Sequence, residues 1–184
     1  METLEAIISR RSVRRYKEKK VPKDMVTKVL EAGRWAPSSK NSQPWSFIIL
    51  EDEKVRRNVA ETTTHGKFLA NAPVGVVVVV DPKVSNHPVE DGAAATQNML
   101  LAAHTLGLGA CWIAAHGSPY EEKLKNILGV PKDKTILSII SIGFPAESPK
   151  TTRKNLGSMV HIDRYGQGVY PLNTGLVSPM ANRG

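Results

Sequence analysis

The stretch Val74-Gly-Val-Val-Val-Val-Val80 constrains the fold more than any other part of this 184-residue chain. Its β-branched residues favour a strand, and they occupy both alternating faces of that strand. A strand that is apolar on both faces must be covered by other elements on both sides. The run therefore predicts the central strand of a buried sheet.

The longest predicted helix follows this strand, over residues 90–106. Alanine and leucine make it apolar over most of its circumference, which is typical of a core helix. Its small residues permit close approach to a sheet, a ring or a partner helix. Gly107 and Gly109 end it.

The remaining elements are placed by periodicity and by turn residues. Leu4, Ile7 and Ile8 recur at helical spacing and predict a short opening helix. A second helix begins at Pro22 and is stopped by Pro37. Further strands are predicted at residues 45–50, 111–115 and 135–143, and further helices at 53–60 and 120–128.

No repeat and no linker divides the chain, so we expect one domain over residues 1–184. Beyond Pro145 the periodicity disappears. The apolar residues embedded there favour an arm, over about residues 150–184, that packs on a partner subunit; a disordered tail is the alternative.

Composition limits the class of protein. No run approaches the roughly 20 apolar residues of a membrane span, and the N-terminus does not resemble a secretory signal. The single cysteine, Cys111, fits a reducing cytoplasm. We therefore expect a cytoplasmic protein without a membrane partner.

The chain is basic, with 25 Lys and Arg against 17 Asp and Glu and a formal charge of +8. Such a charge fits simple solubility, an anionic cofactor or a nucleic acid. Only 5% of the residues are aromatic, and they are not interleaved with the basic ones as a stacking platform requires. Composition therefore argues against a nucleic-acid partner.

Two basic clusters could bind an anion. The first is Arg10-Arg11-Ser12-Val13-Arg14 and the second is Arg153-Lys154. Guanidinium forks match the geometry of a phosphate group, and a serine hydroxyl adds a neutral donor. The alternative is that these are ordinary surface residues after an amphipathic helix, and charge alone leaves both possibilities open.

A polar loop, Pro37-Ser-Ser-Lys-Asn-Ser-Gln-Pro-Trp45, joins a predicted helix to a predicted strand. Its hydroxyl and amide side chains suit a flat, hydrogen-bonding ligand, and binding sites commonly lie at strand ends. An ordinary helix-stop loop is the alternative. The direct entry of Gln43-Pro44-Trp45 into the strand would fix the loop at the edge of the sheet, which favours binding.

Other sites find less support. The histidines lack helical spacing to one another and no Cys-x-x-Cys occurs, so no metal site is expected. Cys111 in an apolar strand is interpreted as a packed thiol. Glu90 and Asp91 are interpreted as favourable charges at the positive end of the core helix.

Several segments resemble the nitroreductase superfamily of FMN-dependent NAD(P)H oxidoreductases, in particular its short members. The matching segments, in family order, are 10–14, 36–45, 94–103, 106–113 and 142–145, followed by Arg153-Lys154. The resemblance implies an α+β fold, a three-layer sandwich with a central mixed or antiparallel sheet flanked by helices. It also implies an intertwined homodimer with FMN in the subunit interface.

The resemblance further implies which residues contact FMN. The phosphate and ribityl end is assigned to Arg10, Arg11, Ser12, Arg153 and Lys154. Arg14 is expected near N1 and O2 of the isoalloxazine ring. The ring's edge, or the partner's ring, is assigned to Pro37, Ser38, Ser39 and Asn41. Backbone groups near N5 and O4 are expected from Ile113, Ala114 and Ala115, with Gln97 as a further contact.

The activity implied is hydride transfer from NAD(P)H, as co-substrate, through flavin N5 to a small electron acceptor such as a nitroaromatic or a quinone. Ping-pong kinetics are expected, with electrostatic support from Arg14 and no catalytic protein nucleophile. Two alternatives stay open. One is a related flavin enzyme with other chemistry, such as dehalogenation or enone reduction; the other is a basic nucleic-acid-binding module without a cofactor.

One departure from the family pattern concerns the end of the strand at 111–115. Many larger relatives place an acidic residue and a glycine there, whereas this chain has Ala114-Ala115. We therefore expect different side-chain contacts to substrate at that point.

Overall fold

The computed structural model describes residues 1–168 and 170, in two compact units, 1–149 and 150–184. The α-helices of the first unit are α1 (Thr3–Ser9), α2 (Lys23–Arg34), α3 (Glu53–Thr62), α4 (Pro88–Thr105) and α5 (Glu121–Leu128). Its strands are β1 (Trp45–Leu50), β2 (Val74–Val80), β3 (Gly109–Ala114) and β4 (Thr135–Gly143). Two 3₁₀ turns, η1 (Ser39–Asn41) and η2 (Lys67–Asn71), complete it.

The four strands form one antiparallel sheet in the order β1-β2-β4-β3. β2 lies between β1 and β4, and all seven of its residues are buried. The prediction of a central strand covered on both sides is therefore confirmed. Sequence predicted the bounds of β1, β2 and β4 as found, whereas β3 begins two residues earlier than expected.

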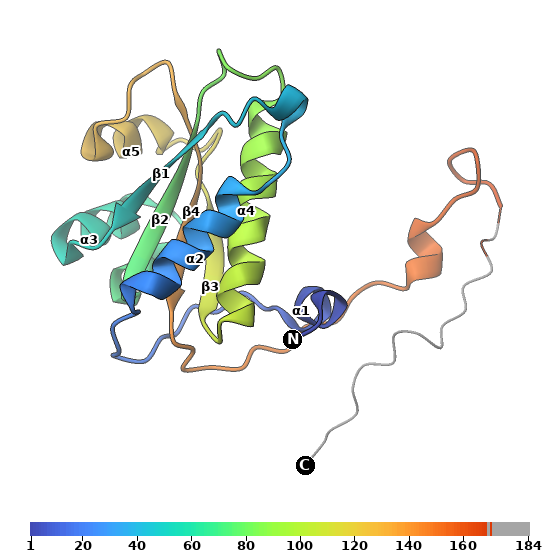
Figure 1. Cartoon of the computed structure of the whole chain (residues 1–184), viewed down its shortest axis with the longest axis horizontal. Coiled ribbons are helices and arrows are strands. Elements are labelled where there is room, and N and C mark those ends of the chain that lie inside the picture. Colours follow the sequence, from blue (N-terminus) through green and yellow to red (C-terminus); the bar gives the residue numbers. More distant parts are fainter. Residues whose placement is uncertain (169, 171–184) are drawn as a thin grey trace. The chain divides into compact units, whose positions relative to one another are not determined.

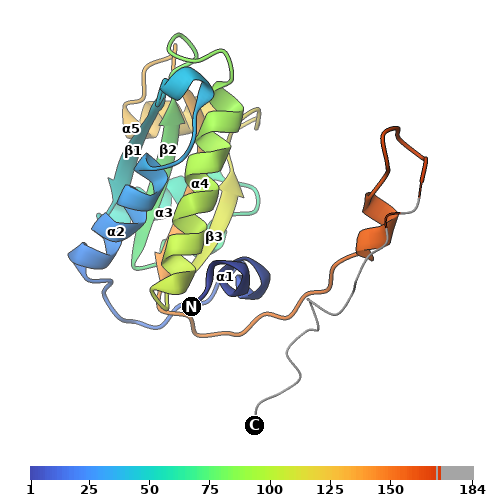
Figure 2. The same ribbon diagram turned by 45° about the vertical axis from the view of Figure 1, so that its right-hand side comes forward.

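Helices cover both faces of the sheet, α2 and α4 on one face and α3 and α5 on the other (Figures 1 and 2). Alternation along β2 explains the two cores: Val76 and Val78 pack with α2 and α4. Val77 and Val79 pack in a separate core, with residues of α3 and α5. The predicted three-layer α+β sandwich is confirmed.

Small residues let α4 approach its neighbours closely. A Cβ built on Gly92 would lie 2.6 Å from side-chain atoms of Leu137 and Val80, and one on Gly33 of α2 would lie 2.9 Å from Met99. Side chains at these positions would push the helices away from the sheet and from each other. Gly33 and Gly92 thus set the thickness of this layer.

Helix α1 forms where predicted, but its apolar residues are not covered within the first unit. Leu4, Ile7 and Ile8 are 71%, 49% and 48% exposed, and Ala6 is the buried residue of the helix. α1 lies beside the C-terminal end of α4 (Figure 2). Its outer face is an apolar surface of the single chain.

The second unit contains the 3₁₀ turn η3 (Leu156–Met159), whose start is capped by the Asn155 side chain accepting from Gly157 N at 2.8 Å. Of the predicted arm, residues 169 and 171–184 lie outside the described residues. Across the described part of the chain, no helix has both the length and the apolar character needed to span a membrane.

Candidate functional site

The arginine segment, residues 10–17, leaves α1 and follows the beginning of β3. Ser12 forms a parallel bridge with Ala110, and Val13 N donates to Ala110 O at 3.0 Å. Further along, Lys17 N donates to Phe144 O at 2.9 Å. The segment is thus held by backbone hydrogen bonds on the edge of the sheet.

Two side chains, those of Tyr16 and Glu147, hold this segment through further hydrogen bonds. The Tyr16 hydroxyl donates to Val13 O at 2.5 Å and lies 2.7 Å from Ser141 Oγ. Burial raises the pKa of Tyr16 well above its ordinary value, so the phenol stays a neutral donor. Glu147 Oε1 accepts from Arg14 N at 2.6 Å and from Arg15 N at 3.1 Å. The backbone of the cluster is therefore fixed without using the Arg14 guanidinium.

The Arg14 side chain is exposed, and its guanidinium carbon lies 5.6 Å from the centre of the Phe68 ring. Phe68 belongs to η2, which begins directly after Gly66. Gly66 packs so closely on β3 that a Cβ built on it would lie 2.7 Å from the Ile113 side chain. Arg14 is thus directed towards the turn that covers β3. Within residues 1–168 its guanidinium has no ion-pair partner, which leaves it able to bind an anion.

The other cationic residues are placed differently. Arg11 Nη1 donates to Ile8 O at 2.6 Å and to Arg10 O at 2.9 Å, so it caps the end of α1. Arg153 and Lys154 are exposed residues of the second unit. The convergence of the two basic clusters on one phosphate remains a prediction.

β3 is the last strand of the sheet, with the arginine segment bonded to its beginning, and its register shows which of its backbone groups face outward. Ala110 O bonds outward to Val13, and in an antiparallel strand every second residue faces the same way. Ala114 therefore also faces outward, whereas Ala115 N donates inward to Leu137 O at 3.3 Å. Of the three backbone positions predicted near the ring, Ala114 is the one with an outward N–H, and its carbonyl accepts from the Tyr120 hydroxyl at 2.7 Å.

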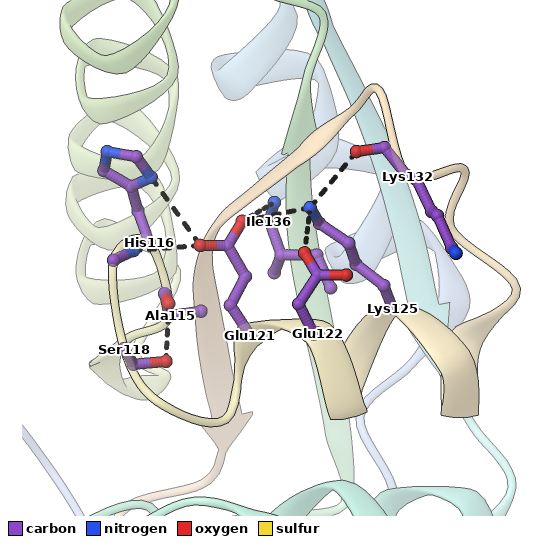
Figure 3. Close-up of polar contacts among 9 residues, drawn as sticks. Ala115, His116, Ser118, Glu121, Glu122, Lys125, Lys132 and Ile136 are labelled. Carbon is purple, nitrogen blue, oxygen red and sulfur yellow. Dashed lines mark hydrogen bonds and ion pairs between the residues drawn. The ribbon is translucent and has the colours of Figure 1, made fainter.

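The turn that follows β3 is held by a largely but not fully buried carboxylate on α5, that of Glu121 (Figure 3). Glu121 accepts from Gly117 N at 2.9 Å through Oε2 and from Ile136 N at 3.1 Å through Oε1. The buried Lys125 ammonium lies 3.8 Å from Glu121 and 2.7 Å from Glu122. The role of Glu121 cannot be identified from the sequence, because a glutamate in the first turn of a helix is common for reasons of charge alone.

The polar loop at residues 37–45 is locally strained. Lys40, Asn41 and Gln43 have φ values of 52°, 56° and 46°, in the left-handed region. This conformation costs roughly 1–2 kcal/mol for residues such as Lys40 and Gln43, whereas asparagine tolerates it better. Ser38 Oγ accepts from Gln43 N at 2.9 Å and closes the loop on itself. Strain of this kind persists where surrounding contacts enforce it and is common at ligand sites.

Asp91, in the first turn of α4, anchors this loop. Its Oδ1 accepts from Ser39 N at 2.9 Å and its Oδ2 from the Ser85 hydroxyl at 2.5 Å. From the sequence, Asp91 was interpreted only as a favourable charge at the helix end. Nothing in the sequence reveals that the carboxylate is buried and reaches a loop 52 residues away.

The loop and the arginine segment lie at opposite ends of α4 (Figure 1). The loop bonds to Asp91 in the first turn, whereas Ser9 Oγ, just before the arginine segment, lies 2.7 Å from Nε2 of His104 in the last turn. Thirteen residues of helix separate these anchors by about 20 Å. Gln97 is exposed between them on α4.

The donors fit a ligand with an anionic end and a polar, planar end. The exposed guanidinium of Arg14 can bind the anionic end, and the N–H of Ala114 on β3 points outward. In the loop, Ser42 Oγ is buried and has no hydrogen-bond partner among the described residues. Such an unpaired buried hydroxyl is costly unless a ligand or water satisfies it.

Known proteins resemble this chain in sequence and fold. Residues 7–66 and 60–144 match the family model described as "Nitroreductase family". An Archaeoglobus fulgidus protein named "Putative NADH dehydrogenase/NAD(P)H nitroreductase" is 39% identical over 153 residues, covering 79% of this chain and 87% of the relative. A Bacillus subtilis protein named "FMN reductase [NAD(P)H]" is 28% identical and covers 89% of this chain and 74% of its own length.

A solved structure gives the same result for the fold. The FMN-dependent nitroreductase from Clostridium difficile R20291 superposes with a TM-score of 0.83 at 32% identity. The match covers 89% of this chain and all of that protein.

Proposed function

The chain belongs to the nitroreductase family, and from this premise we propose that it transfers hydride from NAD(P)H to a small electron acceptor, such as a nitroaromatic or a quinone, by a ping-pong mechanism. It is an NAD(P)H-dependent flavin oxidoreductase with FMN as its cofactor. When bound, FMN supplies the ring that accepts and passes on the hydride; the protein supplies position and electrostatics.

One observation carries the assignment of roles: the guanidinium of Arg14 is left without an ion-pair partner within residues 1–168, while its backbone is fixed by Glu147. A fixed cation of this kind stabilises negative charge that develops on a nearby ring. Arg10, Arg11, Ser12, Arg153 and Lys154 are proposed for the phosphate and ribityl end. The outward N–H of Ala114 is the proposed backbone donor to the ring.

We further propose that the site is completed in a homodimer. The loop and the arginine segment lie about 20 Å apart along α4, so a second copy is needed to bring Pro37, Ser38, Ser39 and Asn41 to the same ligand. The exposed apolar face of α1 is a surface that such a copy would cover. A sedimentation measurement should therefore give twice the mass of the chain, with one FMN bound per chain.

The proposed function is tested with purified protein, FMN and either nicotinamide. The protein should retain yellow flavin absorbance after gel filtration. Initial rates at several acceptor concentrations should give parallel double-reciprocal lines, the pattern of a ping-pong mechanism. Protein that stays colourless with excess FMN would rule the proposal out.

Arg14→Ala tests the role of the cation. We expect acceptor turnover to fall by about tenfold or more, the loss of one charged contact, with a smaller change in the Kd for FMN. Lys17→Ala, a nearby exposed cation, is the matched control and should behave as wild type. Equal turnover in Arg14→Ala and wild type, both with FMN bound, would contradict the role.

We also propose that the protein is located in the cytoplasm. Cys111 is free and 2% exposed in β3, which is compatible with a reducing cytoplasm.

A further inference from the structure

The carboxylate of Asp91 joins three separate segments. The residue is 5% exposed, and its two oxygens accept from Ser39 N in the loop and from the hydroxyl of Ser85. Ser85 is itself buried and accepts from His87 N at 3.0 Å, at the start of α4. The loop, the connection after β2 and the core helix therefore meet at one side chain.

Helix electrostatics do not explain why this carboxylate is buried. A negative charge near a helix N-terminus is favourable, but an exposed residue provides it equally well. Glu90, one position earlier, does so: it is exposed, and Nδ1 of His87 lies 3.8 Å from its Oε1. Burying a charge is costly unless hydrogen bonds compensate, so the two donors account for the position of Asp91.

The loop depends on this contact. Bonds within residues 38–43 are local: Gln43 N to Ser38 Oγ, and Gln43 Nε2 to Asn41 O at 3.2 Å. Among the described residues, the bond from Ser39 N to Asp91 is the one hydrogen bond that ties residues 38–43 to the rest of the chain. Three left-handed residues in this segment would relax to other conformations without an anchor.

We infer that Asp91 is a positioning residue, which holds the strained loop in the shape that presents Ser38, Ser39 and Asn41 to FMN. The inference rests on the proposed function and deepens it. Because the contact is made between two residues of the chain itself, it orders the loop without any contribution from the ligand, which then need not supply that ordering free energy.

Three variants test the inference. Asp91→Ala removes the anchor. Asp91→Asn keeps an oxygen that can accept from Ser39 N and an amide that can donate to Ser85 Oγ, which still has lone pairs. Glu90→Gln changes the adjacent acidic residue in the same helical turn and is the matched control.

Two measurements are made on each variant. The Kd for FMN is obtained from quenching of FMN fluorescence, and visible circular dichroism of the bound flavin is recorded at saturating FMN. Asp91→Ala should raise the Kd about tenfold or more and alter the dichroism even at saturation, whereas a purely structural role would leave the saturated spectrum unchanged. Asp91→Asn should recover most of both signals, and Glu90→Gln should match wild type.

Folded Asp91→Ala with a wild-type Kd and spectrum would overturn the inference, as would an Asn variant as weak as the Ala variant. If Asp91→Ala does not fold, Ser85→Ala removes one of the two donors and should raise the Kd about threefold; an unchanged Kd would then overturn it. Failure of the wild-type protein to bind FMN is a different result, because it removes the proposed function itself.

Discussion

The arginine segment and the polar loop present ligand-binding groups in two different ways. Backbone bonds to Ala110 and Phe144 make residues 12–17 an addition to the sheet, and none of these residues has a positive φ. The loop, by contrast, combines three left-handed residues with a single side-chain anchor, Asp91. The arginine segment is thus held by several backbone hydrogen bonds, whereas the loop is held by one hydrogen bond to a side chain.

This difference matches what each region has to bind. A phosphate group is recognised mainly by charge, and long flexible guanidinium side chains adapt to it from a regular backbone. A polar ring edge requires short side chains at fixed positions, so the backbone itself must be shaped. The same contrast predicts that the arginine segment loses ligand binding when its packing on the sheet is removed. The loop should lose ligand binding when its backbone conformation changes.

Tyr16→Ala should have the largest effect. The ring packs in the core on the α3 and α5 side and its hydroxyl bonds Val13, so truncation removes packing and an anchor together. We expect a loss of about 3–5 kcal/mol in the free energy of unfolding, measured by urea denaturation. FMN affinity should fall as the segment detaches from Ala110.

Tyr16→Phe is the control for this prediction. It keeps the ring and deletes the hydroxyl, so the loss should be about 1–2 kcal/mol. If both variants lost equally little stability, the arginine segment would be fixed by its backbone bonds alone, and its contrast with the loop would be greater still.

Sequence predicted the fold well because its elements are locally determined. The apolar run at Val74–Val80 and the small-residue helix that follows it each carry one dominant pattern. The strand formed with the predicted bounds, and the helix formed with its start two residues before the predicted one. The opening helix formed as well, but Leu4, Ile7 and Ile8 are exposed in the part of the chain that the structure describes. Periodicity identifies an apolar face and does not say whether the same chain covers it.

The candidate site was less predictable, since its geometry depends on contacts between distant segments. The composition of the loop and of the arginine segment identified both as candidates, whereas three anchoring residues were not identified: Asp91 for the loop, Glu147 for the arginine segment and Glu121 for the turn after β3. Each anchor is an acidic residue that binds backbone N–H groups, and no spacing rule links it to its partner. The outward direction of the Ala114 N–H follows from the register in which β3 pairs with its neighbours. The sequence of one strand does not determine that register.

Lys40→Gly tests the strain in the loop. Glycine adopts a φ of 52° without a steric cost, so we expect the protein to gain up to about 1 kcal/mol in the free energy of unfolding. FMN should nevertheless bind more weakly, because a glycine loop is less rigid before binding. Thermal unfolding and FMN titration measure the two effects.

Lys40→Ala separates strain from charge. Alanine keeps a Cβ at the same φ and removes the exposed ammonium, so it should show no gain in stability. A stability gain in the alanine variant equal to that of the glycine variant would mean that the charge, and not the backbone conformation, is responsible.

The smallest effect concerns pH and the arginine end of α4. Partial burial, together with the charges of Arg10 and Arg11, lowers the pKa of His104 below its ordinary value of about 6.5. The unfolded chain then binds a proton more readily than the folded one, so stability is complete above pH 6.5 and declines as pH falls below it. The decline should be small, since a partly exposed imidazole is well screened.

His104→Gln checks this sign. Glutamine keeps a polar group that can bond the Ser9 hydroxyl, which now lies 2.7 Å from His104 Nε2, but it does not titrate. Urea unfolding at pH 7.5 and pH 5.5, compared between variant and wild type, should show a smaller loss on acidification in the variant. A wild-type protein that became more stable relative to the variant at pH 5.5 would reverse the assignment, since protonated His104 would then be favoured beside Arg10 and Arg11 in spite of their charge.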